Sequence, residues 1–221
     1  MIRRDYLIRS IEALGEELLR IESLQKEKRW DEADEALDDQ IKRLTGRDAQ
    51  AAVELSETEL LALLIEGEST PIVREKAMLL TRFLKQAGDG ALAQDHADEA
   101  NAYYVKALRL LLKALHGEDP HDFPEFVPRI EELVEAVSSA SISVETQALL
   151  MEHYETTGQF GKAHEVLLSI VAADPMNKDV LDFGTEFYER ISRQSDDRLV
   201  LGELPRSKVE ASLADLRARK G

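Results

Sequence analysis

Apolar residues recur along most of this chain at the three- and four-residue spacing of an amphipathic helix. Near the N-terminus the spacing predicts a first helix with one apolar stripe, made of Leu7, Ile11, Leu14, Leu18 and Ile21. A second stripe follows in Trp30, Ala33, Leu37, Ile41 and Leu44. Gly46 is expected to end this second helix, because glycine readily adopts the left-handed conformation found after helix C-termini.

Capping signals predict where two further helices begin. Ser56 and Glu59 form a capping box ahead of the apolar run 60–65. Thr70 and Pro71 predict another start, since threonine caps well and proline is tolerated in the first turn. We expect that helix to end near Gln86, because the segment 88–90 is Gly-Asp-Gly.

The helical period continues to the C-terminus and predicts helices over 97–115, 128–138, 144–157, 161–173, 178–193 and 207–219. Strand-like alternation is confined to the short stretch 198–201, so the predicted fold class is all-α, an antiparallel array of about ten helices in hairpins. Three prolines mark 117–128 as a loop. We therefore expect an N-terminal helical region 1–116 and a C-terminal region 128–221, joined by 117–127, as one domain or two.

Residues 144–177 resemble a tetratricopeptide helix–turn–helix of 34 residues. The resemblance rests on Leu150, Tyr154, Gly158, Phe160, Ala163, Leu167 and the pair Asp174-Pro175. The chain departs from the pattern at Gln147 and Met151, and weaker echoes occur around residues 30–37 and 100–107. The resemblance implies a tetratricopeptide-like superhelix, with Val209, Leu213 and Leu216 as the apolar face of a capping helix.

Three features of the N-terminal half are residues 4–9, the long amphipathic helix that follows them, and residues 56–61. Together they resemble an uncharacterised bacterial family with a tetratricopeptide-like fold, over roughly residues 1–115. This resemblance implies a bacterial origin and brings no catalytic residues.

Composition and charge make several classes of function less favourable. The 221 residues include 44 acidic and 28 basic side chains, a net charge of -16 that disfavours binding to nucleic acid or to anionic membranes. There is no cysteine, which excludes disulfides and thiolate chemistry and fits a reducing compartment. The longest apolar run, 60–65, is too short to span a bilayer, and charges at residues 3–5 argue against a signal peptide. We expect a cytoplasmic protein.

Motifs for catalysis are weak, and no cofactor is expected. Imidazole and carboxylate groups gather in the loop at His116, Glu118, Asp119, His121 and Asp122, so a metal-dependent enzyme is one alternative. The two histidines are five residues apart across a glycine and a proline, which favours a solvated acidic loop. His164 and Glu165 begin like a metalloprotease helix, but Leu168 stands where the second histidine is needed. We expect His164 on the outside of its helix.

The most specific functional hypothesis is an acidic groove. The tetratricopeptide resemblance places five positions of the first hairpin helix on the inner face: Glu145, Ala148, Glu152, Glu155 and Thr156. The same register in the next helix gives Asp179, Asp182, Glu186, Glu189 and Arg190. Tyr154 and Phe187 are expected to support the packing. Such a groove would bind a basic peptide or a partner helix, without catalysis.

Two other interpretations remain open. On a chain this acidic, the same carboxylates also fit an ordinary solvated surface. The stripe from Leu7 to Ile21 packs either against the second helix or across a homodimer interface. The basic C-terminal residues Arg217, Arg219 and Lys220 are expected to complement the helix dipole.

Overall fold

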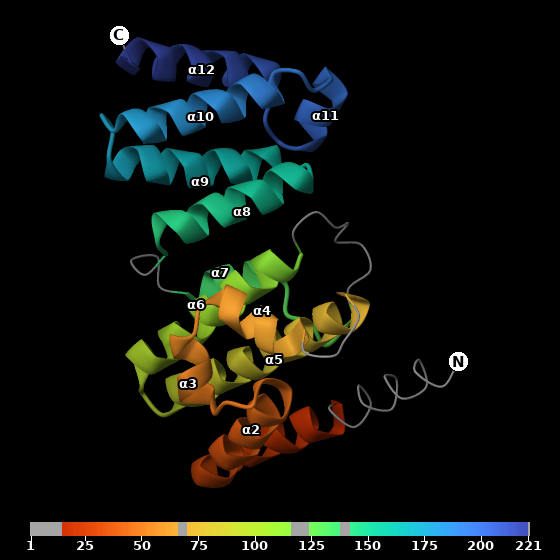
Figure 1. The fold of residues 1–221 in the computed structure, drawn as a ribbon. Helices are drawn as coiled ribbons and strands as arrows, with labels where there is room; N and C mark the ends of the chain where they lie inside the picture. Colours follow the sequence, from red (N-terminus) through yellow and green to blue (C-terminus); the bar gives the residue numbers. More distant parts are fainter. Residues whose placement is uncertain (1–14, 66–69, 116–123, 138–141, 221) are drawn as a thin grey trace. The chain divides into compact units, whose positions relative to one another are not determined.

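The computed structural model describes residues 15–65, 70–115, 124–137 and 142–220. The described chain is helical and contains no strand, so the all-α prediction is confirmed (Figure 1). Contacts divide the chain into two compact units. The first contains Met1–Ala114 and His121–Ile142, and the second contains Leu115–Pro120 and Ser143–Gly221. The division expected from the sequence, at 117–127, stays a prediction.

The first unit is built around a long antiparallel helix pair. It comprises a helix over residues 15–26, followed by α2 (Trp30–Thr45), α3 (Ala49–Glu54), α4 (Glu57–Ile65), α5 (Thr70–Ala93), α6 (Ala97–Ala114) and α7 (Ile130–Ala136). Helices α5 and α6 pack along each other, α2 and α4 pack on α5, and α7 packs on α6.

The predicted apolar stripes supply the core of this unit. Leu18 and Ile21 of the first stripe are buried, as are Ala33, Leu37 and Ile41 of the second. Leu7, Ile11 and Leu14 lie outside the described residues. The described part of the first stripe is therefore covered within the unit, as packing inside the protein requires.

Two predicted caps of the first unit are confirmed, and the predicted cap at Thr70 stays a prediction. The amide N–H of Ser56 donates to a carboxylate oxygen of Glu59 at 2.8 Å, and the Glu59 N–H donates to Ser56 Oγ at 3.2 Å. Gly46 follows α2 with φ 72°, the left-handed conformation expected of it. Helix α3 was not predicted, although Asp48 caps it by accepting the N–H of Ala51.

Helix α5 extends beyond its predicted end. It continues through Gly88 and Gly90 to Ala93, so the expected stop near Gln86 is wrong. A Cβ atom on Gly88 would lie 2.6 Å from a ring carbon of Tyr104, and the Tyr104 hydroxyl donates to Asp89 at 2.9 Å. The glycine is required for close approach of α6, and this packing outweighs its low helix propensity.

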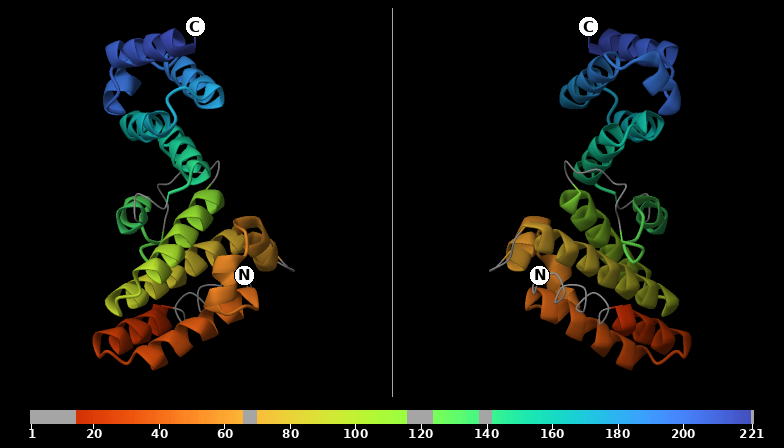
Figure 2. Two further views of the ribbon diagram at one scale, coloured as in Figure 1. Left: turned by 90° about the vertical axis from the view of Figure 1, so that its left-hand side faces the viewer. Right: turned by 90° about the vertical axis from the view of Figure 1, so that its right-hand side faces the viewer.

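The second unit stacks successive antiparallel helices. Its elements are α8 (Val144–Thr156), α9 (Phe160–Ala173), α10 (Lys178–Ile191), the short α11 (Asp196–Leu201) and α12 (Arg206–Lys220). Helix α8 packs on α9, α9 on α10, and α10 on α12, which Figures 1 and 2 show as consecutive layers. Helix α11 occupies the strand-like stretch, and Ser195 caps its start, since the Ser195 hydroxyl accepts the N–H of Arg198.

The hairpin turn between α8 and α9 is formed as the sequence predicted. Gly158 follows α8 with φ 75°, and Ala163 is fully buried where the two helices pack. Tyr154 and Phe187 are both buried, which confirms their predicted packing role. Val209 and Leu216 of α12 are also buried, so this helix covers the last layer with an apolar face.

Candidate functional site

A cavity of about 640 Å³ lies between α8 and α10, within the second unit. All five inner-face positions predicted for the first hairpin helix line it, and Arg190 of α10 joins them. Leu149, Met151, Phe183 and Gln194 complete the described lining. The structure therefore brings together the part of the predicted groove that belongs to α8.

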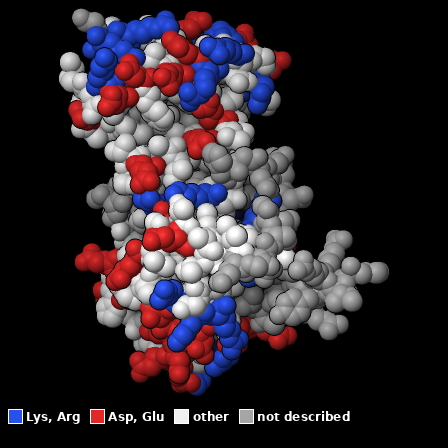
Figure 3. Space-filling model, viewed as in Figure 1, with Lys and Arg blue, Asp and Glu red and all other residues white. Residues whose placement is uncertain are grey.

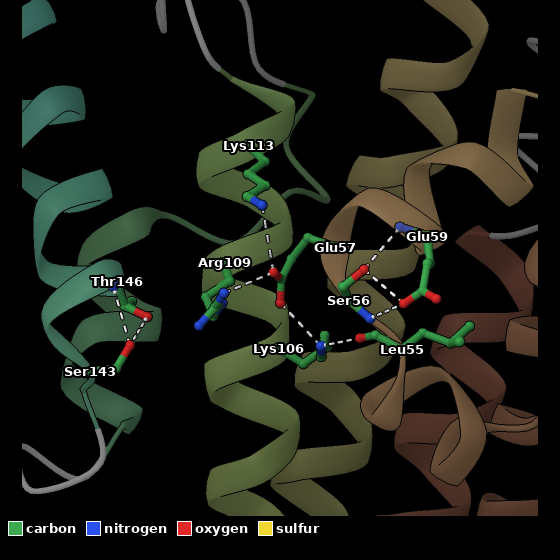
Figure 4. A network of polar contacts seen from close by, with 9 residues as sticks. All are labelled: Leu55, Ser56, Glu57, Glu59, Lys106, Arg109, Lys113, Ser143 and Thr146. Atoms are coloured by element: carbon green, nitrogen blue, oxygen red, sulfur yellow. Dashed lines mark hydrogen bonds and ion pairs between the residues drawn. The ribbon is translucent and has the colours of Figure 1, made fainter.

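The orientation of α8 follows from its sequence. Ser143 caps the helix by accepting the N–H of Thr146 at 3.3 Å, as Figure 4 shows. Leu150 and Tyr154, four residues apart, are buried at 2% and 4% exposure. With that face covered, the residues on the adjoining stripe, Glu145, Glu152 and Glu155, face the cavity.

The packing of α10 differs from the prediction. Asn177 caps the helix, and its apolar face is buried through Leu181, Phe187, Tyr188 and Ile191. Phe183 and Arg190, seven residues apart, are its two residues that line the cavity. Gln194 lies four residues further along and lines it too. Sequence reasoning missed Phe183 and Gln194, although their spacing from Arg190 was a signal for one shared face.

Two of the predicted α10 carboxylates are paired with α12. A carboxylate oxygen of Asp182 lies 2.6 Å from Nζ of Lys220, and one of Glu189 lies 2.8 Å from a guanidinium nitrogen of Arg217. The hydrogen bond from Lys220 lowers the pKa of Asp182. Basic and acidic side chains accordingly lie intermixed over the last helices in Figure 3.

The other two α10 carboxylates lie at the surface. Asp179 and Glu186 are exposed, and neither is among the residues that line the cavity. The continuous acidic inner face predicted across both helices is thus distributed over the cavity, the α12 contact and open surface. Its use in binding stays a prediction for all seven carboxylates.

An ion pair crosses the cavity from α8 to α10. Arg190 donates from Nε to one oxygen of Glu155 at 2.9 Å and from a terminal nitrogen to the other at 2.8 Å. The hydrogen bonds that Arg190 donates to Glu155 raise the pKa of Arg190. Because the lining contains three carboxylates and one guanidinium, its net charge is negative even with this pair formed.

A second acidic cavity, of about 550 Å³, lies in the first unit. Its lining includes Tyr103 and five carboxylates, which are Asp34, Asp38, Asp48, Glu54 and Glu99. Two of these carboxylates serve the helix start at α3, where Asp38 accepts the N–H of Ala49 at 2.9 Å and Asp48 accepts that of Ala51 at 2.8 Å. Burial, followed by the charge of Glu99, raises the pKa of Tyr103 to about 12. Part of this acidity therefore has a structural role.

A buried carboxylate also joins α4 to α6 in the first unit (Figure 4). The side chain of Glu57 is 3% exposed, and its oxygens lie 3.0 Å from Lys106, 3.0 Å from Arg109 and 3.8 Å from Lys113. Burial acts to raise the pKa of Glu57, but the hydrogen bonds and charges of its basic neighbours outweigh burial and hold it below its usual value. This arrangement neutralises the carboxylate and fastens two helices together.

The histidine-containing motifs give no site among the described residues. The loop residues His116, Glu118, Asp119, His121 and Asp122 lie outside the described part of the chain. Within that part, no group of three or more His, Asp or Glu side chains is placed to hold a metal ion. His164 is buried at 1% exposure, so its expected position on the outside of its helix is wrong. Its Nδ1 lies 2.6 Å from the hydroxyl of Tyr188.

No helix in the described ranges combines the length and the apolar character needed to cross a bilayer. A model of a family of unknown function, DUF6483, matches residues 1–221. Because the match extends over the whole sequence, the chain belongs to this family. Comparisons with curated proteins and with solved structures found no match.

Proposed function

We propose that this member of DUF6483 is a non-catalytic protein-interaction module that binds a basic peptide or partner helix in the cavity between α8 and α10. The observation that carries the proposal is the lining of that cavity by Glu145, Glu152 and Glu155. These are the carboxylates that the tetratricopeptide resemblance placed on an inner face. A tetratricopeptide-like hairpin over residues 144–177 is part of the same proposal.

The chemistry of the cavity supports a partner with both apolar and basic side chains. Leu149, Met151 and Phe183 provide apolar surface, and the carboxylates lie beside it. Apolar contact supplies affinity, whereas charge complementarity chiefly sets the association rate and the choice of partner. A segment with a basic face therefore fits better than an acidic one.

The seven predicted carboxylates have different roles in this proposal. Glu145, Glu152 and Glu155 contact the partner, because they line the cavity. Asp179 and Glu186 contribute at long range, because they are exposed on the same unit without lining it. Asp182 and Glu189 act mainly in holding α12 through Lys220 and Arg217.

The proposal is tested with two synthetic amphipathic helical peptides that share one apolar face and carry either lysine and arginine or glutamate on the other. Fluorescence anisotropy of each peptide is measured against the full chain at low and physiological salt. We expect the basic peptide to bind and the acidic one to bind at least about tenfold more weakly, a difference of about 1.4 kcal/mol. The difference in affinity between the two peptides should be smaller at physiological salt than at low salt, since salt screens exposed charges.

Charge reversal locates the binding surface. The double variant Glu145→Lys and Glu152→Lys should lose affinity for the basic peptide. The matched control is Glu165→Lys, at an exposed position of α9 that does not line the cavity. Circular dichroism is the check that each variant is folded. Equal binding of both peptides, or equal loss in the control, would contradict the proposal.

A further inference from the structure

We propose that Glu155 is the residue that recognises an arginine of the partner, and that Arg190 occupies this position until the partner arrives. The inference rests on the proposed function and specifies the partner's chemistry. The bound segment carries an arginine whose guanidinium takes the place of the Arg190 guanidinium on Glu155.

The geometry of the resident pair defines the subsite. Both oxygens of Glu155 accept parallel hydrogen bonds from one guanidinium, at 2.9 and 2.8 Å. This two-point contact matches arginine and not lysine, because an ammonium group lacks the planar fork of donors. Glu155 is therefore held in the orientation that a second guanidinium requires.

The pair is accessible enough to exchange. The side chain of Glu155 is 25% exposed and that of Arg190 is 47% exposed. Ion pairs at such exposure contribute little to folding, so opening this one leaves the second unit intact. Exchange of one guanidinium for another also conserves the hydrogen bonds of Glu155.

Arg190 has a second carboxylate within its reach. Glu186 lies four residues earlier on α10, and its charge acts on Arg190 in the folded protein. A glutamate four residues before an arginine is the favourable order for a pair along one helix. When a partner arginine binds Glu155, Arg190 turns to Glu186, so neither charge is left without a counterion.

The surroundings of Glu155 suit the rest of an arginine side chain. Phe183 and Met151 line the same cavity, and Phe183 is half-buried. Guanidinium groups stack on aromatic rings and their methylene stems pack on apolar surface. The half-buried Phe183 in the cavity lining therefore adds contact that a short cation would not gain.

The test uses small probes, so that it does not depend on any peptide sequence. N-acetyl-arginine amide, its lysine analogue and its neutral isostere, the citrulline amide, are titrated into the isotopically labelled full chain and followed by NMR. Arg190→Ala removes the resident guanidinium. The matched control, Arg193→Ala, removes an exposed cation three residues away and leaves Arg190 in place.

We expect Arg190→Ala to bind the arginine probe about tenfold more tightly than the unaltered chain and than Arg193→Ala. The lysine probe should bind at least about fivefold more weakly than arginine, and citrulline should not bind. Adding Glu155→Gln to Arg190→Ala should abolish the binding.

The remaining outcomes distinguish the arginine subsite from the wider proposal of an interaction module. If arginine and lysine bind Arg190→Ala equally, or if neither binds, recognition by Glu155 is wrong. If the basic peptide of the preceding experiment still binds, the interaction module stands without this subsite. If both the peptide and the probe fail, both proposals are wrong.

Discussion

The hydroxyl of Tyr188 on α10 lies 2.6 Å from Nδ1 of His164 on α9, and His164 is almost fully buried. The other ring nitrogen, Nε2, is buried and has no hydrogen-bond partner within the described structure. Burial, followed by the charge of Lys208, lowers the pKa of His164, and Glu165 acts in the opposite direction. The folded second unit therefore favours the neutral imidazole.

This pair predicts a loss of stability on mild acidification. Because the pKa of His164 is lower in the folded chain than in the unfolded chain, the unfolded chain binds more protons below the ordinary histidine pKa of about 6.5. The stability that the neutral His164 contributes to folding is fully present above about pH 6.5, the ordinary histidine pKa, and is lost as the pH falls through the pKa of His164 in the folded chain. Urea unfolding measures the free energy of unfolding at pH 7.5 and at pH 5.5. The decrease between these two pH values should be smaller in His164→Gln than in the unaltered chain. An equal difference in the two proteins would contradict the prediction.

Substitution of Glu57 should lower the stability of the first unit more than protonation of His164 lowers that of the second. Glu57→Gln leaves Lys106 and Arg109 without their buried counterion, which should cost about 3 kcal/mol of unfolding free energy. Urea denaturation followed by circular dichroism measures the change. Glu54→Gln, an exposed neighbour, is the control and should stay within about 0.5 kcal/mol. The effect of Glu57→Gln should shrink as the pH falls through the lowered pKa of Glu57, since the native carboxylate then loses its charge.

Gly88 tests the close approach of α5 and α6. Gly88→Ala would gain helix propensity of up to about 1 kcal/mol. The added Cβ would lie 2.6 Å from a ring carbon of the buried Tyr104, which should cost about 1–3 kcal/mol and give a net loss. Gly15→Ala is the control, since a Cβ there meets nothing within 4 Å and should not destabilise the chain. A higher melting temperature for Gly88→Ala would show that the ring moves aside freely.

The carboxylates paired with α12 should affect stability more than binding. The variants Asp182→Lys and Glu189→Lys place a cation opposite Lys220 or Arg217 and should lower the melting temperature. Their affinity for the basic peptide should change less than about twofold at physiological salt, because they do not line the cavity. A loss as large as that of the Glu145 and Glu152 double variant would instead place them on the binding surface.

Much of the helical structure could be predicted because its causes lie close together along the chain. The capping box of Ser56 and Glu59 and the left-handed Gly46 and Gly158 depend on residues within one helical turn. The same holds for the cavity-facing stripe of α8, since residues three and four apart share a helix face. A known hairpin pattern was enough to place Glu145, Glu152 and Glu155 on one surface.

The sequence by itself determined an all-helical chain, most helix boundaries and the acidic face of α8. The tertiary structure decided which side of α10 faces the cavity, because Arg217 and Lys220 of α12, 28 or more residues away in sequence, pair with Glu189 and Asp182. It also decided the length of α5 through Tyr104 and the burial of His164 through Tyr188. Helical periodicity shows which residues share a face of a helix. It does not show which distant segment of the chain packs against that face.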